Sequence, residues 1–440
     1  MEQTKGISRG ASLGICIILI VIMEIATGFS EIWYTGILRF LVSAIFVYCI
    51  YKGLQQEYII NAYLLFSLTP LSLLIYSEDF SSYYLRELTA STWVFAIINM
   101  VAFLAAFSLS GNRPAKKVRM GPLSFYDVSD ENTKIDQGKL KQHAVILSVI
   151  GFLPSAYMLV FHSAMPLSAI IGFFAYIGIA FAFRSRNRGT IIFCILLSAV
   201  GFFQDFNKTR LLYLVLTILL CIEVYVVESK RQRAKYMGAG LLAVVGMLLV
   251  AFPLKSFTRS GGDIFTFFKN SAEISANAFS YYDNRFNFAG PNFLRMPYMY
   301  LAQGWNNLQY VIQTQDTRTF GLWLFKPLLG YFQIDGRFAD QYVMTPFSPA
   351  FNTFTYMAVL FKDFGYYGSV LGSIFLGVFV KAVVRRLHKD CSAFVTASSA
   401  LVLMATLEMF FSNHFFGMSY PFTIVIIGFL YMKLFHLDGY

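Results

Sequence analysis

Two pairs of basic residues bracket two consecutive apolar runs in the sequence. Lys208 and Arg210 stand just before the first run, and Lys255 and Arg259 stand just after the second. If the two runs form antiparallel helices, both pairs lie at the same end of the helix pair. Arginine donates bidentate hydrogen bonds to phosphate oxygens and keeps its charge. The four residues therefore predict a pocket for a lipid pyrophosphate. The alternative is basic side chains that reach the headgroups of ordinary lipids.

An aromatic segment between residues 254 and 352 combines rings with side-chain amides. Its stretch RMPYMYLAQGWNN offers rings that can stack on the C–H faces of sugars and amides that can bond sugar hydroxyls. An aromatic belt at the level of the lipid headgroups is the alternative interpretation of any single ring. The residues that we expect to contact a glycan are Arg295, Tyr298, Tyr300, Trp305 and Asn306.

Proton transfer needs a residue that titrates near neutral pH on the same side as these groups. His414 meets this requirement by position, because it follows a predicted helix that contains Glu408 and lies in the connection SNHFFGMSYP. Asp363 is the rival candidate for a general base. It adjoins Lys362, so a helix N-cap or an ion pair is its structural interpretation. The acidic residues of the aromatic segment are scattered, and we expect no divalent metal and no cofactor.

The composition indicates that lipid surrounds these residues. Hydrophobic residues make up 57% of the 440 residues and charged residues 13%, whereas soluble proteins carry about 25% charged residues. This pattern excludes a cytosolic enzyme, a secreted domain and a disordered regulator. A net charge of +11 would suggest nucleic acid in a soluble protein. Here we attribute it to basic cytoplasmic loops and expect no nucleic-acid partner.

Apolar runs of about 20 residues predict twelve membrane-spanning helices. The runs lie near 11–29, 32–51, 58–77, 88–109, 143–162, 165–183, 189–204, 211–228, 236–253, 364–384, 392–411 and 419–436. The chain therefore divides into helices one to nine over 1–253, a large outer segment over 254–352 and helices ten to twelve over 353–440. A charged cytoplasmic linker is expected at 110–142.

The distribution of basic residues predicts that both termini are cytoplasmic. The inner segments hold 22 Lys and Arg residues, while the short outer connections hold only Arg86, Lys208 and Arg210. By the positive-inside rule the large segment then lies outside the membrane. Its stretches 288–312 and 319–332 are too apolar for a floating loop and too interrupted to span. We therefore expect interfacial or re-entrant helices there.

Four stretches resemble the oligosaccharide repeat-unit polymerases, the Wzy-type O-antigen polymerases. DFNKTRLLYLVLTILL is similar to the family element in which an arginine, here Arg210, opens an apolar helix. FPLKSFTRSGG resembles the basic exit of the following helix, and PYMYLAQGWNNLQYVI resembles the tyrosine-rich segment of the large outer loop. The family's Asn-x-x-Thr and Asp-Phe-Gly-x-x-Gly pattern is matched by Asn352, Thr355, Asp363, Gly365 and Gly368.

The resemblance implies an all-α polytopic membrane protein of the GT-C-like class in a bacterial inner membrane. It implies a glycosyltransferase whose donor and acceptor are oligosaccharides carried on undecaprenyl pyrophosphate. Membrane lipid and a co-polymerase that regulates chain length are the implied partners. Together with the resemblance, the residues predict Arg210 and Arg259 as catalytic, with His414 chosen by its position as the base. The predicted substrate contacts include Lys208, Lys255, Asn352 and Asp363. The family's late outer basic residue has no arginine here, because Asn413 and His414 stand in that region.

Two alternatives stay open at this stage. An O-antigen ligase would share the architecture and the need to bind a pyrophosphate. A transporter or flippase of lipid-linked oligosaccharide would need sites near the bilayer midplane and alternating access. This chain concentrates its polar groups in one outer segment, which favours an enzyme.

Overall fold

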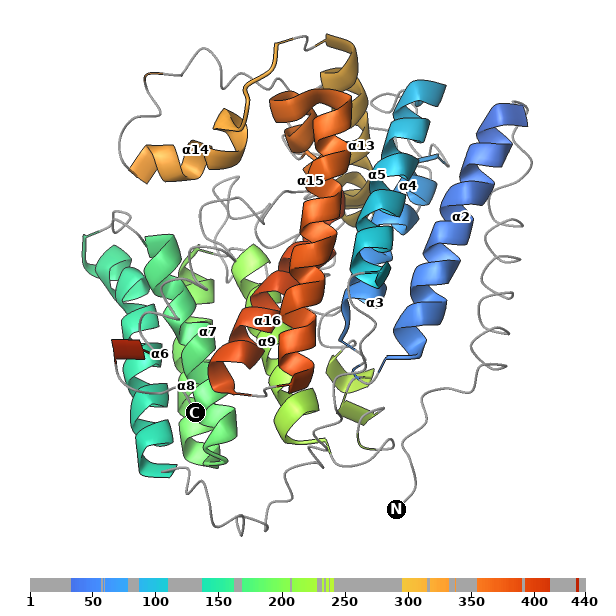
Figure 1. Cartoon of the computed structure of the whole chain (residues 1–440). Coiled ribbons are helices and arrows are strands. Elements are labelled where there is room, and N and C mark those ends of the chain that lie inside the picture. The colour runs from blue at the N-terminus through green and yellow to red at the C-terminus, as the bar shows by residue number, and fades with distance from the viewer. Residues whose placement is uncertain are drawn as a thin grey trace. The chain divides into compact units, whose positions relative to one another are not determined.

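The structure is a computed structural model of the whole chain (Figure 1). Every element among the described residues is a helix, and no strand occurs in them. The predicted all-helical class is therefore confirmed. The structure describes residues 33–56, 58, 60–77, 87–109, 137–161, 168–205, 208–227, 232, 235–236, 238–240, 295–314, 317–331, 337, 354–389, 392–411 and 433–434.

The chain forms two compact units, and each unit combines segments that are distant in the sequence. Unit 1 comprises residues 1–110, 246–379 and 406–414. Helices from the start of the chain thus share one unit with helices from its last third. The described helices of unit 1 are α2 (Trp33–Leu54), α3 (Ala62–Phe66), α4 (Leu68–Ser77), α5 (Ala90–Leu109), α13 (Arg295–Thr314), α14 (Leu322–Tyr331), most of α15 (Tyr356–Lys389) and the 3-10 helix η3 (Glu408–Phe410).

Unit 2 comprises residues 111–245, 380–405 and 415–440. Its consecutive helices α6 to α9 pack on one another, as Figure 1 shows in green. The connections between them are short, so neighbouring helices must run antiparallel. The described helices of unit 2 are α6 (Gln137–Phe161), α7 (Ser168–Arg184), α8 (Arg188–Asp205), α9 (Lys208–Tyr225) and most of α16 (Ala393–Leu407).

Among the described residues, five helices are long and apolar enough to cross a membrane. Large hydrophobic side chains are exposed along several of these helices, for example Phe40 on α2, Ile98 on α5 and Leu153 on α6. Such exposure is typical of surfaces that face lipid rather than water. The described helices therefore indicate a membrane protein. The five helices are Thr35–Leu54, Ala90–Ser108, Gln137–Phe161, Tyr356–His388 and Ala393–Phe410.

The other predicted spans correspond to shorter helices or lie mainly outside the described residues. Shorter apolar helices occur at Ala62–Ser77, Ile171–Arg184, Arg188–Val200 and Leu211–Tyr225. Three predicted spans lie wholly or mostly outside the described residues: 11–29, 236–253 and 419–436. Most of the linker at 110–142 lies outside them as well. The count of twelve spans and the GT-C-like class therefore stay predictions.

The predicted span at 58–77 forms two helices, α3 and α4, that meet at Ser67. Pro70 explains the break, because proline lacks the N–H that would continue the helix and its ring crowds the carbonyl four residues earlier. Asn61 marks the start of α3, since its side-chain oxygen accepts a hydrogen bond from the backbone N–H of Leu64 at 3.1 Å. Among the described helices, α4 is one on which α13 packs.

Small and polar side chains join α15 to α5 within unit 1. The hydroxyl of Ser373 donates to the side-chain oxygen of Asn99 at 2.7 Å, and the amide of Asn99 donates to the carbonyl of Phe95 at 2.9 Å. One turn along α15, a Cβ added at Gly377 would collide with the carbonyl oxygen of Phe103. Small residues commonly allow this close approach between membrane helices.

Glycines allow the same close approach between α6 and α7 in unit 2. A Cβ at Gly178 of α7 would lie 2.8 Å from the backbone nitrogen of Ser148 and 2.9 Å from the carbonyl of Ala144. A Cβ at Gly151 of α6 would lie 2.6 Å from the Cβ of Ala175. Each helix therefore supplies a glycine where the backbone of the other passes.

Candidate functional site

The predicted site residues fall into three groups. The first group lies outside the described residues and consists of Lys255, Arg259, Asn352 and His414. For the second group the position in a helix is described, but nothing of the side chain: Lys208, Arg210, Arg295 and Tyr300. For the third group the side chains are described as well: Tyr298, Trp305, Asn306 and Asp363.

Trp305 and Asn306 hold α13 against α4. The indole Nε1 of Trp305 donates to the hydroxyl of Ser72 at 2.9 Å, and the Trp305 side chain is fully buried. The hydroxyl of Tyr76 donates to Oδ1 of Asn306 at 3.4 Å. Tyr298 is buried on the same helix. These contacts give Trp305 and Asn306 a role in positioning α13, and a direct contact of either residue with a glycan stays a prediction.

Gln309 attaches α13 to the segment that precedes α5. Its Oε1 accepts a hydrogen bond from the backbone N–H of Thr89 at 2.7 Å, and its Nε2 donates to the carbonyl of Glu87 at 2.9 Å. One amide side chain thereby pairs with the backbone on both sides of Leu88. Although the sequence placed this helix in a large outer segment, α13 is an integral part of unit 1.

Gln303 is the exception among the buried amides of α13. Its side chain is fully buried, and neither its oxygen nor its nitrogen has a hydrogen-bond partner among the described residues. The hydroxyl of Thr69 on α4 is likewise buried and without a partner there. Leaving such a group unpaired costs about 1–3 kcal/mol. Ordered water molecules are the usual partners of such buried polar groups.

The elements α4, α13 and η3 contact one another. A Cβ at Gly304 would lie 2.6 Å from the carbonyl of Phe410 and 3.1 Å from Cγ2 of Thr355, so α13 and η3 are in close contact. Glu408 in η3 is fully buried. The contact between α13 and η3 therefore places the carboxyl group of Glu408 in the same part of unit 1 as the helix that carries Gln303.

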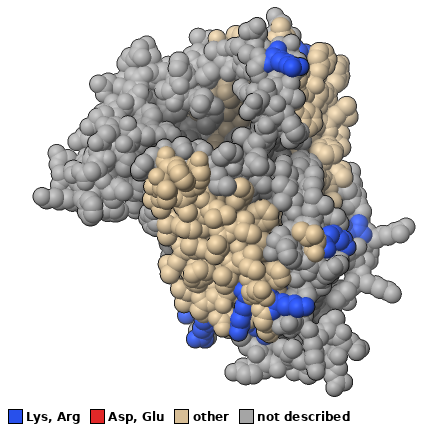
Figure 2. All heavy atoms as spheres, turned by 90° about the vertical axis from the view of Figure 1, so that its left-hand side faces the viewer, with Lys and Arg blue, Asp and Glu red and all other residues tan. Residues whose placement is uncertain are grey.

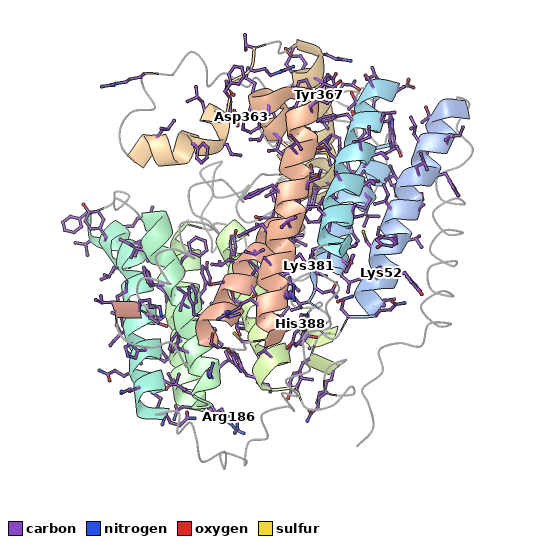
Figure 3. The ribbon with its side chains drawn as sticks, in the orientation of Figure 1. Lys52, Arg186, Asp363, Tyr367, Lys381 and His388 are labelled. Carbon is purple, nitrogen blue, oxygen red and sulfur yellow. The ribbon has the colours of Figure 1, made fainter. Side chains whose placement is uncertain are left out.

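Asp363 stands near the start of α15 and caps a different helix, α14 (Figure 3). Its Oδ1 accepts hydrogen bonds from the hydroxyl of Thr319 and from the backbone N–H of Trp323, the latter at 3.0 Å. Its Oδ2 accepts from the backbone N–H of Leu324 at 2.8 Å. A carboxylate at this position pairs the free N–H groups of a helix start and interacts favourably with the helix dipole. The carboxylate of Asp363 is thus fully engaged by α14.

Backbone contacts complete this connection, which we call the α14 clamp. The N–H of Thr319 donates to the carbonyl of Lys362 at 3.2 Å, and that of Phe320 donates to the carbonyl of Asp363 at 3.0 Å. The ammonium of Lys362 donates to the hydroxyl of Thr317 at 3.1 Å. The α14 clamp therefore consists of residues 317–324 held against residues 362–363.

The Gly of the Asp-Phe-Gly motif has a structural explanation. Gly365 has φ 69° and interrupts the regular geometry of α15, a backbone conformation that residues with a side chain rarely adopt. A Cβ there would lie 3.2 Å from Nε of Arg318. The guanidinium of Arg318 in turn lies 4.3 Å from the ring centroid of Phe361. The motif therefore shapes the α14 clamp.

Lys208 and Arg210 occupy the first turn of α9, at one end of unit 2. Because α8 and α9 are antiparallel, this end is separated by the length of α8, about 27 Å, from the connection between α7 and α8. That connection carries Arg184, Arg186 and Arg188. Figure 2 shows Lys and Arg side chains gathered along the lower edge of the face that this unit presents. The start of α9 is therefore a second basic position, remote from the main one.

No group of three or more His, Cys, Asp or Glu residues that could hold a metal ion occurs among the described residues. A metal-free mechanism stays a prediction, because several acidic residues of the large segment lie outside them.

Comparisons of the chain with protein-family models, with curated proteins and with solved structures find no match. The resemblance to repeat-unit polymerases therefore rests on the sequence motifs alone. Sequence reasoning did not identify Ser72, Gln303 or Thr319 as members of the candidate site. A short polar side chain in an apolar helix carries no spacing signal, and only its partner on another helix reveals its role.

Proposed function

We propose that the protein polymerises lipid-linked oligosaccharide repeat units on the outer face of a bacterial inner membrane. The observation that carries this proposal is the position of Lys208 and Arg210 on the first turn of α9. They lie at the end of unit 2 opposite the arginines of the α7–α8 connection. Basic residues collect on the cytoplasmic side of membrane proteins. A basic residue at the opposite end therefore calls for a specific anionic partner.

The pyrophosphate of a lipid-linked donor is the partner that fits this position. When the sugar leaves undecaprenyl pyrophosphate, negative charge develops on the pyrophosphate oxygens. Fixed Arg and Lys donors stabilise that charge in the transition state. In this proposal Arg210 and Arg259 bind the pyrophosphate, with Lys208 and Lys255 beside them. Nucleotide sugars are absent outside the membrane, so a donor that is already activated is required.

The acceptor is a hydroxyl group of a second lipid-linked repeat unit. Its oxygen forms a bond to the anomeric carbon of the donor sugar, while the bond from that carbon to the pyrophosphate breaks. The hydroxyl proton passes to a base, for which His414 is the proposed residue. An oxocarbenium-like transition state needs only weak help from the nucleophile, so positioning by the arginines is the larger effect.

The described part of α13 supports the proposal indirectly. Trp305, Asn306 and Gln309 fix this helix on α4 and on the segment before α5. We propose that the fixed helix presents Arg295 and Tyr300, near its start, to the glycan. The remaining features of the proposal are twelve spans, a GT-C-like arrangement, both termini in the cytoplasm and a chain-length-regulating co-polymerase as partner.

The pattern of surface glycan in a strain that lacks the gene tests the proposal. Loss of a polymerase leaves single repeat units on the lipid core, and complementation restores the ladder of longer chains. Complete absence of repeat units from the core would contradict the proposal and indicate a ligase. Accumulation of lipid-linked units on the cytoplasmic side would contradict it and indicate a flippase.

A further inference from the structure

Several exposed aromatic residues lie in the α14 clamp or within a few residues of it in the sequence, and Phe325 and Phe364 both lie near Gly321. These rings are unusually accessible, with exposed fractions of 89% for Tyr367 and 82% for Phe320. A soluble surface rarely leaves several large rings in water at one place. We name these residues the aromatic cluster: Phe320, Phe325, Phe364, Tyr366 and Tyr367.

The cluster continues into an apolar face of α15. Leu371, Ile374, Phe375 and Val378 are exposed on this helix at helical spacing below Tyr367. No charged residue occurs between Asp363 and Lys381 in the sequence. This face of α15 is therefore a continuous apolar surface, and its end nearest Tyr367 is aromatic.

The opposite face of α15 is used within the chain. Ser369, Ser373 and Gly377 are on that side, where Ser373 bonds Asn99 of α5 and Gly377 approaches the backbone of Phe103. Since one face packs on α5, the exposed face is the one available to surroundings outside the chain.

The spacing along α15 matches the thickness of a bilayer. Basic residues begin at Lys381 and continue with Arg385 and Arg386, and Figure 3 shows Tyr367 and Lys381 well apart along the same helix. At about 1.5 Å per residue, Tyr367 and Arg386 are separated by about 28 Å. The hydrocarbon core of a bilayer is about 30 Å thick. Tyr and Trp are enriched at the membrane–water interfaces.

We propose that the aromatic cluster lies in the membrane–water interface at the kink of α15 around Gly365, and that the bilayer lipids cover it. The α14 clamp then holds α14 at the level of the headgroups. The apolar face that runs from the cluster towards Lys381 argues for lipid, because the same surface continues without interruption into a candidate membrane span. This proposal concerns the depth of α14 and does not depend on the proposed polymerase activity.

The α14 clamp connects α14 to α15, so the depth of α14 in the bilayer follows from the position of α15. The carboxylate of Asp363 bonds the first turn of α14, and backbone bonds join Thr319 and Phe320 to the same place. Gly321, with φ 93°, provides the turn between these bonds and the helix. Because these bonds join α14 and the residues just before it to α15, the depth of α14 follows that of α15.

Tryptophan fluorescence of the full-length protein in liposomes tests this placement. The protein has four native tryptophans, and the variants Phe320→Trp and Tyr367→Trp each add one more indole at an exposed position. Lipids brominated near the headgroup or near the chain end then quench the added fluorescence according to depth. The matched control is Phe375→Trp, about 12 Å farther along α15 than Tyr367.

We expect the headgroup-proximal bromines to quench the two cluster variants more strongly than the chain-end bromines do. The order should be reversed for the Phe375→Trp control. If the cluster variants are not quenched by either lipid while the control is quenched, the cluster faces water, a partner protein or a second copy, and the proposal is overturned. Stronger quenching of the cluster variants by the chain-end bromines also overturns it, because the cluster would then lie within the hydrocarbon.

A second pair of variants tests the role of the clamp. Phe325→Trp reports on α14 itself, and Asp363→Ala removes the carboxylate that holds the first turn of that helix. When Phe325→Trp is combined with Asp363→Ala, the quenching of the α14 probe should depend less on the position of the bromine atoms. When Tyr367→Trp is combined with Asp363→Ala, its dependence on bromine position should stay unchanged. An unchanged profile of the α14 probe would show that the clamp does not set the depth.

Discussion

Thr319 and Asp363 are joined side chain to side chain, although 44 residues separate them in the sequence. Both residues are buried. The bond makes Asp363, in α15, a structural member of the α14 clamp. It connects α15 to Thr319, which lies just before α14.

Removing the carboxylate should destabilise this region. Asp363→Ala leaves the N–H groups of Trp323 and Leu324 without their carboxylate partner, and the hydroxyl of Thr319 keeps only a long bond to the carbonyl of Lys362. Each buried group left unpaired costs about 1–3 kcal/mol. We expect a lower midpoint of thermal unfolding in detergent and faster proteolysis near α14. Thr314→Val is the control, since this exposed hydroxyl bonds only its own helix and its loss should have little effect.

Ser72 and Trp305 should be energetically coupled. Ser72→Ala leaves the indole N–H of Trp305 unpaired in the core, which should cost about 1–3 kcal/mol. In a chain that already carries Trp305→Phe, the same serine change should cost less, because no indole N–H is present. A double-mutant cycle on thermal unfolding measures the difference. Equal costs in both backgrounds would mean that the hydrogen bond contributes nothing.

Two glycines of α7 should respond oppositely to alanine. Gly178→Ala places a Cβ 2.8 Å from the backbone nitrogen of Ser148, and overpacking of this kind costs about 1–3 kcal/mol. Gly172→Ala meets no atom within 4 Å and should be neutral or slightly stabilising, since alanine favours the helix. Thermal unfolding of the two variants, compared in the same detergent, checks the contrast. Equal stabilities would contradict the described contact between α6 and α7.

Arg210→Ala should abolish most polymerisation while the protein remains in the membrane. Loss of one fixed donor to a developing anion typically costs about 10²–10³ in rate. Arg210→Lys should recover only part of the activity, because lysine lacks the bidentate fork. Arg188→Ala, at the opposite end of unit 2, is the matched control and should give full ladders. Full-length glycan ladders from Arg210→Ala would remove the arginine from the proposed site.

Labelling with an impermeant thiol reagent checks the orientation of the chain. Gly189→Cys lies beside the arginines of the α7–α8 connection and should be protected in intact spheroplasts. Gln313→Cys lies at the exposed end of α13 and should react. Both measurements use a background without the native cysteines, and permeabilised cells provide the control for accessibility. Reaction of the first site with protection of the second would invert the predicted topology.

The length of the apolar runs was sufficient to predict the positions of the long described helices. The sequence pattern also predicted helices at α13 and α14, because these stretches are apolar but interrupted. The break at Ser67 was missed, although Pro70 is the residue that causes it. The boundary of a helix near a proline depends on a single backbone contact, which an average over an apolar run does not detect.

The roles of individual polar residues were harder to predict. Asp363 was predicted as a substrate contact and a rival base, with a cap of its own helix or a pair with Lys362 as the structural alternative. Its described partners are Thr319, Trp323 and Leu324. Trp305 and Asn306 were expected to face a glycan, and their described partners are Ser72 and Tyr76. In each case the partner comes from a segment that is distant in the sequence, so local spacing contains no information about it.

The bonds between α13 and the early helices have a consequence for biosynthesis. Ser72 and Trp305 are 233 residues apart, and Glu87 and Gln309 are 222 residues apart. At about 5–20 residues per second, the ribosome needs on the order of 10–50 s to deliver these partners. During that interval Ser72 lacks its partner on α13, and its hydroxyl bonds only the carbonyl of Thr69 in its own helix among the described contacts. Unit 1 is therefore completed late, and chaperones or the insertion machinery have a defined period in which to protect it.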